Sequence, residues 1–222
     1  MKEYYRRHLP HWQPRDAVFF VTFRVKNSMP YEVIESLRKE QERAKKALVQ
    51  SQQDDVEEDG YFRRWDIYLD KAEFGPRWLS QPEIADIVKE ALHYRDGKVY
   101  DLHAFCIMSN HVHIVFEPSS KSDWQSDLLD ESECQPDHDR SEYHFDLPKI
   151  MQSLKRHTAR QANLILGRDG AFWQDESYDR VIRDSEEYVR VINYVLENPV
   201  KAGLVSTWDE WQWTYCSPDV FS

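Results

Sequence analysis

The sequence predicts an α+β fold in which an antiparallel sheet carries its helices on one face. The first reason is the order of predicted elements along the 222 residues, which is strand, helix, helix, strand, strand, helix, strand, helix. The second is the short turn Met108-Ser109-Asn110, which joins two apolar runs and so makes neighbouring strands antiparallel. A chain of this length can form one sizeable core, so we expect a single domain over residues 1–222.

The first half of the chain is predicted to form three strands and two helices. Residues 17–25 are rich in β-branched and aromatic side chains, which favours a strand. Apolar residues recur at helical spacing from residue 30 to about residue 50, and residues 81–94 form a second helical segment that ends at a glycine turn. Residues 99–107 and 111–116 are apolar and β-branched and form the two strands of the hairpin.

The second half is predicted to hold two longer helices with extended chain between them. One helix starts at about Leu147 and stops at Gly167. Residues 171–174 and 180–183 have the composition of short strands or of an extended connection. The final helix spans residues 184–198, because an aspartate followed three residues later by a glutamate is a capping-box-like start and a proline follows its end.

The negative charge of the chain is concentrated in two segments without clear periodicity, which we interpret as acidic surface insertions at about 52–62 and 118–146. Residues 54–59 hold five acids, and residues 118–146 hold nine acids against two bases. These segments account for a charge of −12, so the rest of the chain carries about +1 although the net charge is −11. The overall acidity therefore does not exclude a nucleic-acid partner.

Composition also limits where the protein acts. No stretch approaches the eighteen or more apolar residues of a membrane span, and the N-terminal residues lack the apolar core of a secretory signal. The three cysteines are an odd number without paired spacing, which is typical of a reducing compartment. We expect a cytoplasmic, nucleoid-associated protein without a membrane partner, and the sequence leaves open whether it is a monomer or a homodimer.

Two histidines, His111 and His113, form the main candidate metal site. Successive side chains of a strand point to opposite faces, so these two imidazoles are neighbours on one face. Neutral imidazole is a common metal ligand, and such a pair can converge on one divalent ion. A bare His-x-His is, however, more often an ordinary strand feature, so other parts of the chain must decide between the two interpretations.

A basic stretch is compatible with either a solvated helix face or a nucleic-acid contact, and its lack of acids makes the second about as common as the first. Between Pro148 and Arg168 the chain has five bases and no acid. On the predicted helix these bases lie largely away from the apolar positions. We predict Lys155, Arg156 and Arg160 as phosphate contacts.

Tyr194 is the candidate nucleophile. It lies about 200° around the final helix from the apolar position Ile192, so it does not belong to the apolar stripe. It shares its face with Arg190, one turn before it, and with Asn198, one turn after it. From the helix alone, an ordinary surface tyrosine ahead of the Asn-Pro stop is the more common interpretation. A phenol on a polar face could attack a phosphodiester if this helix faces the histidine strand. Arg190 is predicted as a further DNA contact.

Several collinear segments of the chain form recognisable motifs. In chain order they are Tyr5-Arg-Arg-His8, Phe20-Val-Thr-Phe23, Ile107-Met-Ser-Asn-His-Val-His113, Ile150-Met-Gln-Ser-Leu-Lys155, Thr158-Ala-Arg160, Phe172-Trp-Gln174, Tyr178-Asp-Arg-Val-Ile-Arg183 and Tyr194-Val-Leu-Glu-Asn-Pro-Val-Lys-Ala-Gly203. Together they resemble the REP-associated tyrosine transposases, a branch of the single-tyrosine HUH-type transposases. Ser109 differs from the proline that this family usually has before its Asn-His pair, and the insertion at 118–146 is also unusual.

The resemblance implies a ferredoxin-like antiparallel sheet and a DNA strand transferase. His111 and His113 would be metal ligands for Mg²⁺ or Mn²⁺, with Asn198 as the third ligand. Tyr194 would be the nucleophile. The expected partner is single-stranded DNA beside an imperfect hairpin, cleaved to a 5′-phosphotyrosine and a free 3′-OH.

Two other functions stay open at this stage. A domesticated relative could bind hairpin DNA without cutting it, and such a protein would not need Tyr194. A His-x-His metallo-phosphoesterase would use water as the nucleophile, and Tyr194 would then be incidental. The presence of both histidines and the tyrosine favours the strand transferase.

Overall fold

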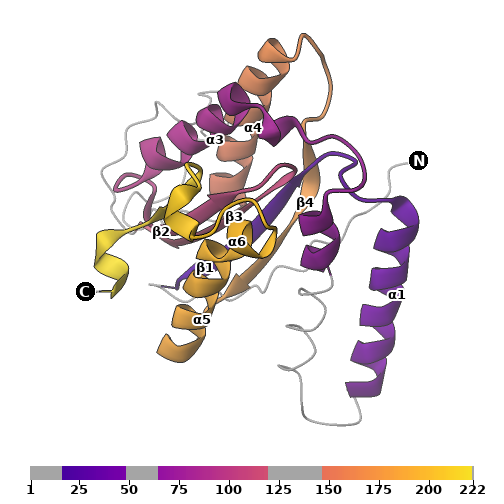
Figure 1. The fold of residues 1–222 in the computed structure, drawn as a ribbon. Coiled ribbons are helices and arrows are strands. Elements are labelled where there is room, and N and C mark those ends of the chain that lie inside the picture. The colour runs from indigo at the N-terminus through magenta and orange to yellow at the C-terminus, as the bar shows by residue number, and fades with distance from the viewer. Residues whose placement is uncertain (1–16, 49–64, 120–146, 222) are drawn as a thin grey trace, which may run out of the picture.

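The computed structural model describes residues 17–48, 65–119 and 147–221, and shows an antiparallel sheet with the strand order β4-β1-β3-β2-β5 (Figure 1). The predicted insertion at 52–62 lies outside these residues, as does nearly all of the predicted insertion at 118–146. The longer elements are β1 (Phe19–Val25), α1 (Tyr31–Leu48), a helix at 65–71, α3 (Pro82–Arg95), β2 (Tyr100–Ile107), β3 (His111–Pro118), α4 (Leu147–Ile165), β4 (Trp173–Val181), α5 (Ser185–Leu196), α6 (Asn198–Lys201) and β5 (Thr214–Cys216).

The first four strands have ferredoxin-like topology. β1 pairs with β3 and β4, and β3 pairs with β2, in each case antiparallel. Helical chain connects β1 to β2, a tight turn connects β2 to β3, and α4 connects β3 to β4. This is the β-α-β-β-α-β order of that fold. The predicted fold class is therefore confirmed, and β5 adds a fifth strand beside β2.

Helices cover both faces of this sheet. α3 and α4 lie together on one face, over a core that includes Val21, Phe23, Val112 and Ile114 (Figure 1). α5 covers the opposite face. The predicted arrangement on one face therefore holds for α3 and α4 but not for α5, because the strands are apolar on both sides.

The second face owes its apolar character to the alternation of strand residues. Phe20, Ala104, Cys106 and Val115 point to the side opposite the larger core and are buried against α5. α5 contributes its own apolar stripe to this layer. Its members are Val191, Ile192, Val195 and Leu196.

Most predicted elements are observed, with informative differences after α4. The two predicted short strands are one strand, β4, which pairs with β1 from Trp173 to Val181 with one irregularity. The Asp184 side chain caps α5 by accepting a hydrogen bond from the Glu187 amide, as predicted. The last helix is divided, because α5 ends at Leu196 and Asn198 begins the short helix α6.

The helix at 65–71 has no counterpart among the predicted elements. Trp65 and Leu69, on one of its faces, pack in a small apolar cluster with Met29 and Leu37. The chain beyond it is held close to the end of β1. Gly75 adopts φ +73°, and a Cβ there would lie 2.0 Å from the Asn27 carbonyl oxygen. These contacts hold the helix against the face of the sheet that carries the two histidines.

Candidate active site

The two histidines lie at the start of β3 and are completely buried. His113 is paired across the sheet with Thr22, and His111 with Arg24. The Nε2 atoms of the two imidazoles lie 3.0 Å apart, so both rings direct this nitrogen to one point. The predicted convergence of the two side chains is therefore present.

The other ring nitrogens have partners that fix the orientation of each imidazole. His111 Nδ1 lies 2.7 Å from Asn110 Oδ1, an acceptor, so His111 donates through Nδ1 and keeps a lone pair on Nε2. His113 Nδ1 lies 2.7 Å from Thr22 Oγ1, and a hydroxyl can accept the same kind of hydrogen bond. Outer partners of this kind commonly orient metal-binding histidines.

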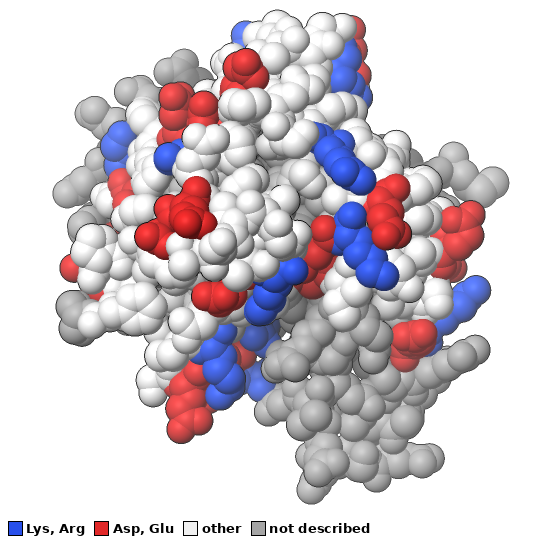
Figure 2. Space-filling view, in the orientation of Figure 1, with Lys and Arg blue, Asp and Glu red and all other residues white. Residues whose placement is uncertain are grey.

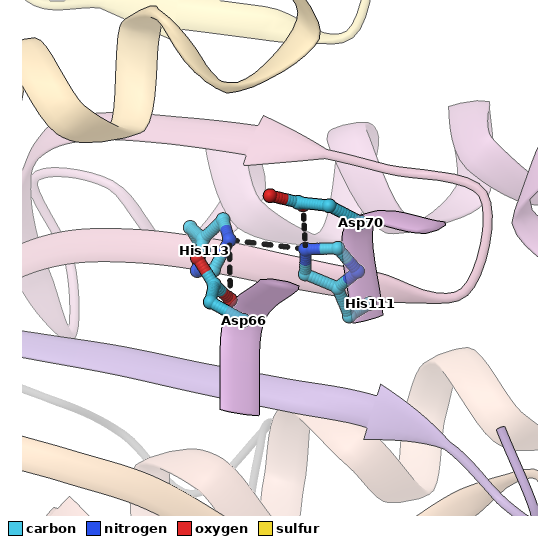
Figure 3. A group of neighbouring side chains, drawn as sticks. All are labelled: Asp66, Asp70, His111 and His113. Atoms are coloured by element: carbon cyan, nitrogen blue, oxygen red, sulfur yellow. Dashed lines mark hydrogen bonds and ion pairs between the residues drawn. The ribbon is translucent and has the colours of Figure 1, made fainter. Parts of the chain in front are cut away.

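Two carboxylates complete the group. Asp66 and Asp70 lie one turn apart on the helix at 65–71 and point at the histidines (Figure 3). Asp66 Oδ1 is 3.4 Å from His113 Nε2, and Asp70 Oδ1 is 3.6 Å from His111 Nε2. The four ligand atoms all lie within 4.8 Å of one another. Sequence reasoning missed both aspartates, and their only local signal is the spacing of two acids by four residues.

Burial shifts the pKa of every member of this group toward the neutral form. Burial raises the pKa of Asp66 well above its ordinary value, the nearby Asp70 raises it further, and Lys201 and Asn198 oppose these effects. Burial raises the pKa of Asp70 to about 7 against the influence of Lys201. Burial lowers the pKa of His111 to about 3 and also lowers that of His113. The carboxylates are therefore costly in their charged form unless a cation joins them.

The donor set fits a divalent cation. If His113, like His111, keeps its lone pair on Nε2, the two lone pairs face each other at 3.0 Å and repel unless a positive charge lies between them. Two adjacent ligands of an octahedral ion, each at about 2.1 Å, are also about 3.0 Å apart. Among the described residues, neither oxygen of Asp66 accepts a hydrogen bond of normal geometry. Carboxylate oxygens suit Mg²⁺ and Mn²⁺, and imidazole broadens the choice toward transition metals.

Asn198 is also at this site. Its side chain is fully buried, and in the part of the chain that the structure describes neither polar atom of its amide has a hydrogen-bond partner of normal geometry. It is close enough to Asp66 to favour the charged carboxylate. An unsatisfied amide beside the carboxylates is compatible with the predicted ligand role, which stays a prediction.

Metal affinity is expected to rise with pH, because Asp70 must lose a proton to bind an ion. Below its pKa of about 7, Mn²⁺ should bind about tenfold more weakly for each pH unit and each proton released. The raised pKa of Asp66 also makes metal binding weaker at lower pH, whereas His111 stays neutral between pH 6 and pH 8 and adds no pH dependence. Calorimetry at pH 6 and pH 8 measures this difference.

Asp70→Asn is the matched control for this measurement. It should bind Mn²⁺ more weakly than wild type at pH 8 and show a shallower pH dependence. Equal wild-type affinity at both pH values would mean that Asp70 is not a ligand.

Tyr194 lies beside the histidine pair. Its ring contacts that of His113 edge-on, with centroids 5.6 Å apart, and that of Phe20 at 6.1 Å. Its hydroxyl oxygen is buried although the residue is partly exposed. The ammonium of Lys201, on α6, lies 4.8 Å from the centre of the Tyr194 ring. The structure thus brings the predicted nucleophile to the predicted metal site and adds Lys201, which the sequence did not single out.

Two other tyrosines lie on the same face. Tyr178 lies on β4 and is paired across the sheet with Thr22, and its ring centroid is 6.4 Å from that of Phe20. The Tyr188 hydroxyl lies 2.8 Å from His103 Nδ1. Neither has a ring contact with His113 comparable to that of Tyr194 among the contacts observed in the described residues.

The predicted DNA contacts fall into three different environments. The Lys155 ammonium donates to the carbonyl oxygens of Gln174 and Asp175 and to the Ser177 hydroxyl. The side chain therefore connects α4 to β4, and this use of the ammonium argues against the predicted phosphate contact. Arg156 and Arg160 are exposed on α4, on the face opposite the histidines.

The remaining predicted DNA contact, Arg190, is exposed on α5. Its guanidinium lies 3.9 Å from Glu186, a solvent-exposed pair that holds the side chain weakly. Figure 2 shows basic side chains over the part of the surface where Figure 1 places α5 and α6, mixed with acids. Arg190 is therefore on the surface of the helix that carries Tyr194.

Comparisons with known proteins agree with the motifs. No protein-family model matches the chain. A protein of Haemophilus influenzae that is named as a REP-associated tyrosine transposase is 21% identical over 118 residues, or 53% of this chain. The resemblance is confirmed. The matched region spans 59% of the length of that relative.

A solved structure described as a REP-associated tyrosine transposase bound to a REP hairpin also aligns with this chain. The identity is 14%, the alignment covers 96% of this chain and 82% of that one, and the TM-score is 0.48. Separately, no helix within the described residues combines the length and apolar character needed to cross a bilayer.

Proposed function

We propose that this protein is a metal-dependent single-stranded DNA endonuclease and strand transferase that acts at hairpin sequences of the REP type. The observation that carries the proposal is the placement of the Tyr194 ring beside His113, in a group where two Nε2 atoms and two carboxylates converge. The named relative from Haemophilus influenzae supports the same reaction class. The expected location is the cytoplasm, in association with the nucleoid.

The chain supplies each part of a transesterification. His111, His113 and the oxygen ligands Asp66, Asp70 and Asn198 would hold a Mg²⁺ or Mn²⁺ ion. Such an ion polarises a phosphodiester and stabilises the charge that develops on it. The Tyr194 oxygen forms a bond to phosphorus, its proton is released, and the 3′ oxygen of the leaving strand departs and is protonated. The product is a 5′-phosphotyrosine, which conserves the ester for a second transfer.

Lys201 has a positioning and electrostatic role in this proposal. A phenol has an ordinary pKa of about 10, so it is a weak nucleophile at neutral pH unless a cation stabilises its charged form. Lys201 is the cation beside the Tyr194 ring. We expect Lys201→Met to slow adduct formation by about tenfold to a hundredfold, measured by quenched-flow assays of adduct yield.

A matched control for Lys201 lies on the other side of the molecule. The Lys98 ammonium is 3.6 Å from the centre of the Tyr94 ring and makes the same kind of contact away from the site. Lys98→Met should leave the rate unchanged. An equal effect of both substitutions would show that loss of positive charge, and not the place of Lys201, is responsible.

The exposed arginines of α4 are expected to contact DNA phosphates. Neutralised phosphates release counterions, so affinity falls with salt in proportion to the number of contacts. Each phosphate contact contributes about 0.7 on single-stranded DNA, or about 0.9 on duplex, to the slope of log affinity against log salt concentration. Replacing Arg156 and Arg160 together by alanine should therefore reduce the magnitude of this slope for hairpin binding by about 1.4 to 1.8. Fluorescence anisotropy over a salt series measures the slope.

Lys155→Met is the control for this salt series, because its ammonium is used inside the protein. It should leave the slope unchanged and lower the free energy of unfolding by about 1.5 to 3 kcal/mol, the usual contribution of hydrogen bonds to a charged group. If Lys155→Met flattens the slope and the arginine variant does not, the DNA contact is Lys155 after all.

Covalent trapping tests the proposed function. Wild-type protein is incubated with hairpin DNA that has single-stranded flanks, with Mn²⁺ or with EDTA, and the products are separated under denaturing conditions. The proposal predicts a protein–DNA adduct and a free 3′-OH with Mn²⁺ only. Cleavage without an adduct supports the water-dependent phosphoesterase, and tight binding without cleavage supports a non-cleaving DNA-binding protein.

A further inference from the structure

A small cavity lies next to the histidine pair, between β1, β4 and the helix at 65–71. Its volume is about 190 Å³. Pockets for drug-sized ligands begin at about 300 Å³, so this one suits a single planar ring system and not a whole nucleotide. Its walls include Thr22, Arg24, Trp65, Leu69, Glu176 and Tyr178.

The cavity shares its walls with the candidate active site. Thr22 bonds to the outer nitrogen of His113, and Arg24 is paired across the sheet with His111. Trp65 and Leu69 lie on the same short helix as the two aspartates, each one residue before an aspartate. A group bound in the cavity is therefore adjacent to the place where a scissile phosphate must lie.

Arg24 gives the cavity a buried hydrogen-bond donor. The residue is 5% exposed, and its guanidinium lies 5.4 Å from the centre of the Trp65 ring and 3.3 Å from the Ser28 hydroxyl. Burial lowers the pKa of Arg24, and the charge of Glu176 opposes that effect. Glu176 is exposed and adds an acceptor to the rim of the cavity.

These walls match an unpaired base better than they match a phosphate. The carboxylate of Glu176 repels an anion, whereas the aromatic side chains of Trp65 and Tyr178, which line the cavity, are of the kind against which planar groups pack. Bases of single-stranded nucleic acid stack on aromatic rings and on guanidinium planes. Guanine presents two acceptors, O6 and N7, to an arginine and presents an amino donor to a carboxylate.

We propose that this cavity binds an unpaired guanine of the single-stranded DNA, next to the phosphate that Tyr194 attacks. Arg24 donates to the acceptor edge of the base, and Glu176 accepts from its amino group. The inference rests on the proposed function and adds to it a base-selective subsite. The helix at 65–71 would then serve both the metal site and the recognition of DNA.

The test is a binding measurement that needs no cleavage. Fluorescein-labelled dT oligonucleotides with one central dG, dA or dC are titrated with wild-type protein in EDTA and followed by fluorescence anisotropy. We expect the dG oligonucleotide to bind at least about fivefold more tightly than the other two, because one good bidentate base contact gives that discrimination or more. An oligonucleotide with a central abasic site should bind no better than dA.

Glu176→Gln should reduce this preference and fold normally, since the residue is exposed. Glu90→Gln, an exposed acid on α3, is the control and should keep the preference. Equal affinity for all bases, or an unchanged preference in Glu176→Gln, overturns the subsite. If adducts form in the trapping assay and no base preference is seen, only the subsite is wrong. If neither DNA binding nor an adduct is observed, the proposed function and the subsite both fail.

Discussion

Replacing Tyr194 by phenylalanine is expected to abolish the protein–DNA adduct, with a loss of at least about a thousandfold in cleavage. The substitution keeps the ring that contacts His113 and Phe20 and removes only the oxygen that would attack phosphorus. Loss of one hydroxyl should change the free energy of unfolding by about 1 kcal/mol or less. Denaturing gels for the adduct and calorimetry for Mn²⁺ binding separate loss of the nucleophile from loss of the site.

Two tyrosines on the same face serve as matched controls. Tyr178→Phe and Tyr188→Phe remove the same group from residues with other contacts in the described part of the chain, since the Tyr178 ring lies against Phe20 and the Tyr188 hydroxyl lies beside His103. Both variants should still form the adduct. An adduct that persists in Tyr194→Phe and disappears in Tyr178→Phe would move the nucleophile to β4.

Replacing His111 and His113 together by alanine should also reduce cleavage by at least about a thousandfold, because both imidazoles that would hold the ion are removed. Hairpin binding in EDTA should stay within about twofold of wild type, since these side chains are fully buried and are not phosphate contacts. Mn²⁺ binding by calorimetry should fall below detection. Far-ultraviolet circular dichroism checks that the variant folds.

A graded variant distinguishes ligand loss from general damage to the core. Thr22→Val removes the hydroxyl beside His113 Nδ1 and keeps the shape of the side chain. Loss of such an outer partner typically lowers metal affinity or activity by about 10- to 100-fold. If the double histidine variant cuts at the wild-type rate, the metal assignment is wrong.

The histidine pair and Tyr194 could be predicted from the sequence because each depends on a local period. Alternation along β3 puts His111 and His113 on one face whatever lies around them. The turn of 100° per residue removes Tyr194 from the apolar stripe of α5. The proximity of β3 and α5 could not be predicted from either local pattern. It follows from the fold, in which α5 packs on the second face of the sheet.

Asp66 and Asp70 could not be predicted in the same way. Their helix is short, and its sequence does not say which surface it packs on. Its position depends on tertiary contacts of Trp65 and Leu69 with Met29, and on the close approach of Gly75 to β1. A pair of acids four residues apart is otherwise most often an exposed feature of a helix.

Lys155 shows what the helical pattern of bases on α4 does not predict. The stripe of bases on α4 correctly indicated the face that is turned away from the apolar core, and Arg156 and Arg160 are exposed there. A lysine has a long flexible side chain, however, and one at the edge of that stripe reaches the carbonyl groups of β4. Helical periodicity predicts the direction of the Cα–Cβ bond, but it does not predict which groups the terminal ammonium of a lysine contacts.

The most direct test of the central claim is to identify the residue that carries the DNA after cleavage. Wild-type protein is trapped on hairpin DNA with Mn²⁺, digested with nuclease and protease, and analysed by mass spectrometry. The structure leads us to expect the nucleotide on Tyr194, within the peptide that includes the start of α6. A nucleotide on Tyr178 or Tyr188, or cleaved DNA with no modified tyrosine at any time point, would contradict it.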